Sequence, residues 1–178
     1  MGLEIERRFL VKNEDWKSLV ILSENFKQGY LNSNIEDWAV RVRIIDNQKS
    51  FLTLKSSLTG LINNEFEYQI PIQDALELLN LSKYKISKTR YHLKFAGGNW
   101  CVDSFNDLNS PLIIAEIELE SPLEKVTVPS WCELEITGKR SLSNASLAKT
   151  PISELSIKDR LKAKEPEQKG NSSFRLSL

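Results

Sequence analysis

The segment that decides the fold is Leu3-Glu4-Ile5-Glu6-Arg7-Arg8-Phe9-Leu10-Val11, in which charged and apolar side chains alternate. Because successive residues of a β-strand point to opposite faces, Glu4, Glu6 and Arg8 would lie together on one face. Leu3, Ile5 and Phe9 would lie on the other face. The turn-prone run Lys12-Asn13-Glu14-Asp15 then ends the pattern. The segment therefore predicts a strand with one charged face and one apolar face.

Similar alternation continues along most of the chain and predicts a mainly β fold. Further strands are predicted at Lys27–Leu31, Trp38–Ile45, Phe51–Ser57, Asn63–Ile72, Ile86–Phe95, Asn99–Phe105, Leu112–Glu120 and Glu133–Thr137. Short helices are predicted at Asp15–Leu22, Asp74–Leu81, Asn144–Ala148 and Ile152–Ala163. We expect one domain of the α+β class over residues 1–164, followed by a disordered polar tail over residues 165–178.

The composition excludes several classes of partner. Among 178 residues, 24 basic side chains balance 24 acidic ones, so no net field attracts nucleic acid or an anionic membrane. No stretch approaches the roughly 20 apolar residues that span a bilayer, and no basic leader precedes an apolar run, so we expect a cytoplasmic protein. Cys101 and Cys132 lack the spacing of a zinc site. We expect packing roles for them, and a disulfide between them stays open.

Whole strand faces carry charges of a single sign. The pairs are Arg41 and Arg43, Glu65 and Glu67, Lys88 and Arg90, and Glu116 and Glu118. For any one strand, a solvated outer face is the more ordinary explanation. A solvated surface usually intersperses the two signs, however, whereas here they are sorted by strand. If the sheet closes with these faces inward, the like charges need a ligand: carboxylates suit Mg²⁺ or Mn²⁺, and guanidinium groups suit phosphate.

Many short motifs occur in the order found in a known family. They are Glu4-Ile5-Glu6-Arg7-Arg8, Gln28-Gly29-Tyr30-Leu31, Val40-Arg41-Val42-Arg43, Leu54-Lys55, Glu65-Phe66-Glu67-Tyr68, Lys88-Thr89-Arg90-Tyr91, Val102-Asp103, Ala115-Glu116-Ile117-Glu118-Leu119 and Glu133-Leu134-Glu135-Ile136-Thr137-Gly138. Together they resemble the CYTH superfamily, the triphosphate tunnel metalloenzymes, from Leu3 to about Pro151. The resemblance implies an eight-stranded antiparallel closed β-barrel, the triphosphate tunnel, with charged faces inward and peripheral helices.

The resemblance also implies roles for individual side chains. The metal ligands would be Glu4, Glu6, Glu116 and Glu118, with Asp103 as a further candidate, and the metal would be Mg²⁺ or Mn²⁺. The phosphates would be bound by Arg8, Arg41, Arg43, Lys55, Lys88 and Arg90. Glu65, Glu67 and Glu135 occupy positions where the family also keeps tunnel acids. Glu4, Glu6 and Arg8 would form the catalytic group.

The chain departs from the family pattern at two places. Arg8 occupies the position of a lysine, and because arginine stays charged it can bind phosphate but cannot serve as a tuned base. After Gly138, Ser141 and Leu142 stand where bacterial relatives often carry a basic residue and a tyrosine, which affects substrate closure or product release. His92, the only histidine, is left out of the predicted site because a lone histidine near a strand end is more often structural.

Members of the family include inorganic triphosphatases, thiamine triphosphatases and class IV adenylate cyclases. No purine pocket is evident, and the short connections resemble small bacterial members that hydrolyse inorganic tripolyphosphate, so we expect that activity. Adenylate cyclase, thiamine triphosphatase and a polyphosphate-binding module without catalytic activity remain alternatives. The expected ligand is an inorganic or organic triphosphate. The apolar outer faces need cover, either from the helices or from a second copy of the chain in a homodimer.

Overall fold

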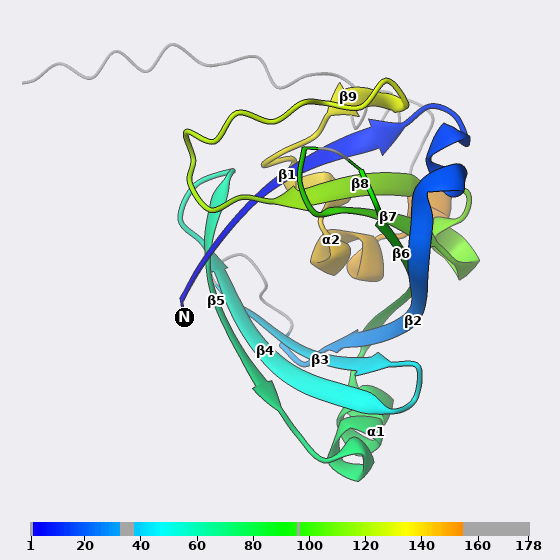
Figure 1. Cartoon of the computed structure of the whole chain (residues 1–178). Coiled ribbons are helices and arrows are strands. Elements are labelled where there is room, and N and C mark those ends of the chain that lie inside the picture. The colour runs from blue at the N-terminus through cyan, green and yellow to red at the C-terminus, as the bar shows by residue number, and fades with distance from the viewer. Residues whose placement is uncertain (1, 33–37, 96, 155–178) are drawn as a thin grey trace, which may run out of the picture.

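The computed structural model describes residues 2–32, 38–95 and 97–154 (Figure 1). The strands are β1 (Leu3–Val11), β2 (Val20–Tyr30), β3 (Ala39–Ile45), β4 (Lys49–Ser57), β5 (Ile62–Gln69), β6 (Tyr84–Leu93), β7 (Trp100–Phe105), β8 (Ile113–Glu118) and β9 (Cys132–Glu135). The α-helices of this part are α1 (Ile72–Leu81) and α2 (Asn144–Lys149), and 3₁₀ helices lie at Asp15–Leu19, Asp107–Asn109, Arg140–Leu142 and Ile152–Glu154. None of these helices is both long and apolar enough to cross a bilayer.

The strands form one antiparallel sheet that closes on itself. Their order is β5-β4-β3-β2-β6-β7-β8-β1-β9, and β1 pairs in addition with β5. The strands from β1 to β8 therefore make a closed eight-stranded barrel, and β9 is added beside β1 outside the ring (Figure 1). The predicted fold, a mainly β closed antiparallel barrel, is confirmed.

Strand β2 is much longer than the sequence pattern indicated. The prediction placed a helix at Asp15–Leu22 and a strand only at Lys27–Leu31, whereas a 3₁₀ helix ends at Leu19 and β2 begins at Val20. The strand then pairs with β6 from Val20 to Tyr30. The helix prediction for residues 20–22 was wrong because pairing with a long neighbouring strand outweighs a weak local pattern.

The last predicted helix and the tail lie mostly beyond the described residues. The helix prediction covered Ile152–Ala163, and the described part of it is a 3₁₀ turn at Ile152–Glu154. The remainder of that prediction, and the disordered tail predicted over residues 165–178, fall outside the described residues.

The register of the barrel turns the alternating charges inward. Glu6 lies opposite Glu118, and Arg8 lies opposite Glu116, across the β1–β8 pair. Side chains of directly opposed residues point to the same face of a sheet. All four side chains therefore face the barrel interior, where they line one cavity.

Helix α2 fills one end of the barrel interior (Figure 1). Leu147 and Ala148 are buried there. They belong to one apolar cluster with Leu10, Tyr30, Ile86, Phe105 and Ile114, which come from five different strands. Ser143 caps the helix, because its Oγ accepts a hydrogen bond from the Ser146 amide at 3.2 Å. Full burial of a leucine stabilises by about 2 kcal/mol, so Leu147 compensates for the weak intrinsic stability of so short a helix.

Helix α1 covers part of the outer surface of the barrel. Its Ala75 is completely buried against Val42 and Ile44 of β3. Pro71 directly precedes the helix, and β5 ends at Gln69 rather than at the predicted Ile72. Proline cannot donate to a sheet ladder, which explains the earlier end of the strand.

A second apolar cluster covers the outer surface near β1, β7 and β8. Phe9 packs on Trp100 with ring centroids 5.6 Å apart, and Trp131 packs edge-on against Trp100 at 5.7 Å. Cys132 is buried in this cluster. Cys132 and Cys101 are both free thiols, so the disulfide that the sequence left open is absent from the structure.

Candidate functional site

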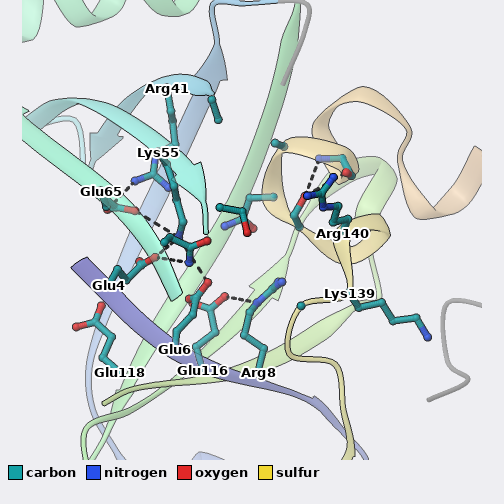
Figure 2. A pocket seen from close by; sticks show the side chains of 18 of the residues that line it. Glu4, Glu6, Arg8, Arg41, Lys55, Glu65, Glu116, Glu118, Lys139 and Arg140 are labelled. Carbon is teal, nitrogen blue, oxygen red and sulfur yellow. Dashed lines mark hydrogen bonds and ion pairs between the residues drawn. The ribbon is translucent and has the colours of Figure 1, made fainter. Parts of the chain in front are cut away.

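A cavity of about 770 Å³ lies inside the barrel and is lined by residues from each of the eight strands of the ring. The predicted site residues that line it are Glu4, Glu6, Arg8, Arg41, Arg43, Lys55, Glu65, Glu67, Arg90, Glu116 and Glu118. The alternation that sorted charges by strand in the sequence therefore collects most of them in one space. Figure 2 shows several of these residues and the contacts that join them.

One wall of the cavity is organised around Lys55 of β4. Its ammonium group forms an ion pair with Glu4 and lies 3.5 Å from Glu6 and 3.3 Å from Glu65 (Figure 2). Asn63 adds a hydrogen bond, donated from its Nδ2 to Glu4 Oε2 at 3.1 Å. A single cation thus holds together three carboxylates from two strands.

Arg41 and Arg43 of β3 extend this wall. Arg41 lies 3.5 Å from Glu65 and 3.4 Å from Glu67, and Arg43 lies 3.5 Å from Glu67. The Nε atoms of both arginines are buried and have no hydrogen-bond partner in the described part of the chain. Burial, and next the charge of Arg41, lower the pKa of Arg43 to about 10. Two guanidinium groups with unused donors therefore face the same cavity.

The opposite wall is built around Glu116 of β8. Arg8 donates from Nε to Glu116 at 3.1 Å, and Arg90 pairs with the other oxygen of the same carboxylate. Arg90 also holds Asp103 through two hydrogen bonds of 2.8 and 2.7 Å. Burial alone would raise the pKa of Glu116, but the charges of Arg90, Lys88 and Arg8 outweigh burial and hold that pKa well below its usual range.

The carboxylate of Glu4 is in a very different electrostatic environment. Burial and, next, the charge of Glu6 raise its pKa to about 7, although Lys55 acts in the opposite direction. The net rise means that Lys55 does not fully compensate for the burial of Glu4 and for the charge of Glu6 beside it. An additional cation would be stabilised here, because the ionised form of Glu4 is under-compensated.

Three predicted site residues lie away from this cavity. Lys88 and Asp103 are almost completely buried, at 1% and 0% exposure, and pair with each other, with the Lys88 ammonium facing the rings of Phe26 and Phe105. Burial, and next the charge of Arg90, lower the pKa of Lys88 to about 8.

Glu135 is the third of these residues. Both of its oxygens accept hydrogen bonds from Arg7, at 2.9 and 2.7 Å. Arg7 belongs to the odd-numbered side chains of β1, which alternate with the cavity-lining Glu6 and Arg8. Among the described residues, the cavity lining includes neither Arg7 nor Glu135.

The cavity also contains residues that the sequence did not point to. At the end near α2 they are Lys139, Arg140, Ser143, Asn144 and Lys149. Lys139 and Arg140 form a basic pair directly after Gly138, and this pair was a signal in the sequence. The family pattern places the basic residue later, at the position of Ser141. The basic residues simply come earlier in the connection.

His92, which was left out of the predicted site, also lines the cavity. Its Nε2 lies 2.9 Å from Glu24 Oε2 and its Nδ1 lies 3.3 Å from Cys101 Sγ. Both ring nitrogens are therefore engaged with protein groups. The alternation with Arg90, two residues earlier on β6, was the signal that placed it on the inner face.

The acids of the cavity suit a metal ion that is bound together with a polyanion. In the described ranges, no three Asp, Glu, His or Cys side chains form a preorganised metal site. Mg²⁺ commonly takes only one or two carboxylates and completes its shell with water and substrate phosphates. Glu4, Glu6 and Glu118 are hard oxygen donors on adjoining strands, and the raised pKa of Glu4 marks a place where positive charge is lacking. This donor set fits Mg²⁺ or Mn²⁺.

Known proteins share both the sequence and the architecture described above. An inorganic triphosphatase of Acetivibrio thermocellus is 40% identical over 153 residues, which cover 85% of this chain and 96% of that protein. The crystal structure of the inorganic triphosphatase NE1496 is 30% identical, with a TM-score of 0.61, and the match covers 82% of this chain and 93% of that one.

A conserved hypothetical protein from Pyrococcus furiosus shares the fold at 22% identity, with a TM-score of 0.54 over 68% of this chain and 81% of that one. The family model for the CYTH domain matches residues 2–150, which is nearly all of the described barrel. The chain belongs to the CYTH domain family.

Proposed function

We propose that this chain hydrolyses inorganic tripolyphosphate with the help of Mg²⁺ or Mn²⁺. The observation that carries the proposal is the cavity itself, in which arginine and lysine side chains already hold carboxylates on both walls. Burying so many charges costs desolvation free energy that ion pairing only partly offsets, and a polyanion bound with metal ions would supply further partners for both signs. The activity for which the two triphosphatases that resemble this chain are named supports the same chemistry.

The basic residues of the cavity would bind the phosphate groups. Arg41 and Arg43 have unused Nε donors on one wall, and Arg8 and Arg90 retain further N–H groups on the other. Guanidinium groups bind phosphate oxygens with two parallel hydrogen bonds, which fixes the position as well as the charge of the chain. Lys55 would exchange its contacts with Glu4 and Glu6 for contacts with a phosphate.

Glu4, Glu6 and Glu118 would hold the metal ion, with Glu116 held in place by Arg8 and Arg90 beside them. When bound, the metal supplies positive charge that stabilises the transition state of phosphoryl transfer. The arginines do the same from fixed positions, because their geometry is set before the substrate arrives. A carboxylate of the Glu4 and Glu6 pair would orient a water molecule towards the terminal phosphorus. Breaking the adjacent P–O bond then yields phosphate and diphosphate.

The lining of the cavity favours an inorganic substrate over a nucleotide. In the described part of the chain, the aromatic side chains of the lining are Tyr30 and His92. Tyr30 is only 3% exposed, and His92 is held by Glu24 and Cys101. Tyr30 therefore offers no open face on which a purine could stack, which leaves the small imidazole of His92, 34% exposed, as the one such ring of the described lining. A ligand made only of phosphate groups would use the charged lining without needing such a surface.

Phosphate release from tripolyphosphate, ATP and thiamine triphosphate, each with Mg²⁺ and with Mn²⁺, tests the proposal. The expected result is the highest kcat/KM with tripolyphosphate and the loss of activity in the double variant Glu4→Gln, Glu6→Gln. Formation of cyclic AMP from ATP as the main product would instead identify a cyclase. Tight binding of tripolyphosphate without turnover under either metal would identify a binding module.

A further inference from the structure

Arg8 makes more contacts with one particular connection than with any part of the cavity. The connection between β9 and α2, residues 136–143, follows the last strand and leads into the helix at one end of the barrel. The Ile136 amide donates to the Arg8 carbonyl at 2.8 Å, and the Arg8 amide donates to Thr137 Oγ1 at 3.1 Å. The guanidinium NH2 then donates to the Leu142 carbonyl at 2.8 Å. Arg8 therefore contacts both ends of this connection.

The same guanidinium group also contacts the neighbouring strand β8. Its Nε donates to Glu116 at 3.1 Å, while its NH2 is bound to Leu142. Two different nitrogens of one rigid plane thus serve two acceptors. The single ammonium of a lysine cannot occupy both positions. Of the five N–H groups of an arginine, three remain for a phosphate.

The connection carries a charged residue, Arg140, whose position the contacts of Arg8 would fix. Arg140 lies between Thr137 and Leu142, is exposed, and lines the cavity next to α2 (Figure 2). Its side chain makes no hydrogen bond or ion pair with another residue in the described ranges. Its position therefore depends on the backbone of the connection, and that backbone is held by the turn hydrogen bond from Ser143 to the Arg140 carbonyl at 3.0 Å and by Arg8.

We propose that Arg8 is a positioning residue that fixes the connection between β9 and α2, and so places Arg140 to bind the polyphosphate at this end of the cavity. The inference rests on the proposed function, since it assigns Arg140 to the same substrate. Arg8 and Arg140 then act as one unit. The arginine at position 8 compensates for the earlier place of the basic residue in the connection, because only a guanidinium group can hold both Glu116 and the Leu142 carbonyl.

Hydrogen exchange of the metal-free full chain tests whether Arg8 holds the connection, and it does not require enzymatic activity. In Arg8→Lys, the amides of residues 139–143 should exchange about tenfold faster, because a charge-assisted hydrogen bond to the segment is lost while the charge is kept. Arg7→Lys is the matched control, since Arg7 pairs with Glu135 outside the cavity, and it should leave those amides unchanged. Unchanged exchange in Arg8→Lys would overturn the proposal.

A double-mutant cycle tests whether the contacts of Arg8 with the connection position Arg140 for binding of tripolyphosphate. The dissociation constant of tripolyphosphate is measured by calorimetry in EDTA, where no metal supports turnover. Arg8→Lys and Arg140→Gln should each weaken binding by about tenfold, and the double variant by hardly more than either one. A product of the two effects, about a hundredfold, would show independent contacts and would contradict the inference.

A second variant keeps the test open if Arg8→Lys fails to fold. Ser141→Gly loosens the exposed middle of the connection and leaves Arg8 in place. It should weaken binding of tripolyphosphate by about threefold in the wild-type background and should have no effect in Arg140→Gln. Equal weakening in both backgrounds would refute the role of Arg140. A chain that binds tripolyphosphate normally but never hydrolyses it would disprove the proposed activity while leaving this positioning role in force.

Discussion

Replacing Lys55 by methionine should destabilise the protein in a strongly pH-dependent way. The ammonium group forms an ion pair with Glu4 and lies 3.5 Å from Glu6 and 3.3 Å from Glu65. At an effective dielectric constant of about 20, one contact of this length is worth about 4 to 5 kcal/mol of attraction before desolvation. After desolvation is included, removing one member of a buried pair costs about 3 to 5 kcal/mol. We expect a loss of about 3 kcal/mol in the free energy of unfolding near pH 8.

The sign of the pH dependence follows from the carboxylates that remain. Without Lys55, the pKa of Glu4, already raised to about 7, rises further, and the pKa of Glu65 loses the lowering that the charge of Lys55 contributes. A raised acid pKa in the folded state means that stability falls as pH rises through the interval between the two values. The deficit should therefore shrink to below about 1 kcal/mol near pH 5, where the acids bind protons. Added Mg²⁺ should restore part of the stability at the higher pH by replacing the missing positive charge.

Urea unfolding at the two pH values, with and without Mg²⁺, measures both effects. Lys125→Met provides the control, because Lys125 is exposed and has no ion pair within the described residues. Equal destabilisation of Lys55→Met near pH 5 and near pH 8 would refute the reasoning, because the loss would then arise from packing rather than from unbalanced charge.

Three further substitutions probe separate parts of the structure. Glu4→Gln should lower kcat with tripolyphosphate by at least about a hundredfold. It should also raise the melting temperature above pH 7, because it removes a carboxyl whose pKa is raised to about 7. Thermal unfolding in EDTA at pH values on both sides of 7 measures the change. Glu116→Gln should lower the free energy of unfolding, measured with urea, by about 3 to 5 kcal/mol, because it leaves Arg8 and Arg90 without their shared partner. Glu118→Gln is its control: the Glu118 carboxylate has no ion pair in the described ranges, so the loss should be less than about 0.5 kcal/mol. Leu147→Ala should lose about 2 to 4 kcal/mol, measured by urea unfolding, because it opens a cavity between α2 and the barrel; a loss below about 1 kcal/mol would show that α2 is not needed for the fold.

The sequence predicted the inner face of the barrel well because strand alternation is a local property. Glu4, Glu6 and Arg8 could be placed together from their spacing alone, and the same reasoning placed Arg41 and Arg43. Alternation identifies a face, however, and not a depth along the barrel axis. Lys88 and Arg90 share a face of β6, but Lys88 lies beside Phe26 and Phe105, where apolar rings fill the interior. Only the three-dimensional packing shows that Arg90 lines the cavity whereas Lys88 does not.

The parts of the site that lie on connections were harder to predict. Arg140 belongs to a segment without strand periodicity, so its spacing carries no information about where it points. In our proposal its place depends on the hydrogen bond from Arg8, which is far away in the sequence, to the Leu142 carbonyl of the same connection. The extent of β2 was missed for a related reason, because its first half is defined by pairing with β6 rather than by its own residues.

The close contact of two glycines beside the cavity limits which sequences this fold can accept. A Cβ atom at Gly138 would lie 2.9 Å from the Gly60 Cα, and one at Gly60 would lie 3.0 Å from the Gly138 Cα. Gly138 also has a φ of 75°, which side chains other than glycine adopt with difficulty. Gly60 lies in the connection between β4 and β5 and Gly138 in the connection between β9 and α2, where a survey of random variants would normally find tolerance. In such a survey these two positions should stand out as intolerant of every substitution, alanine included.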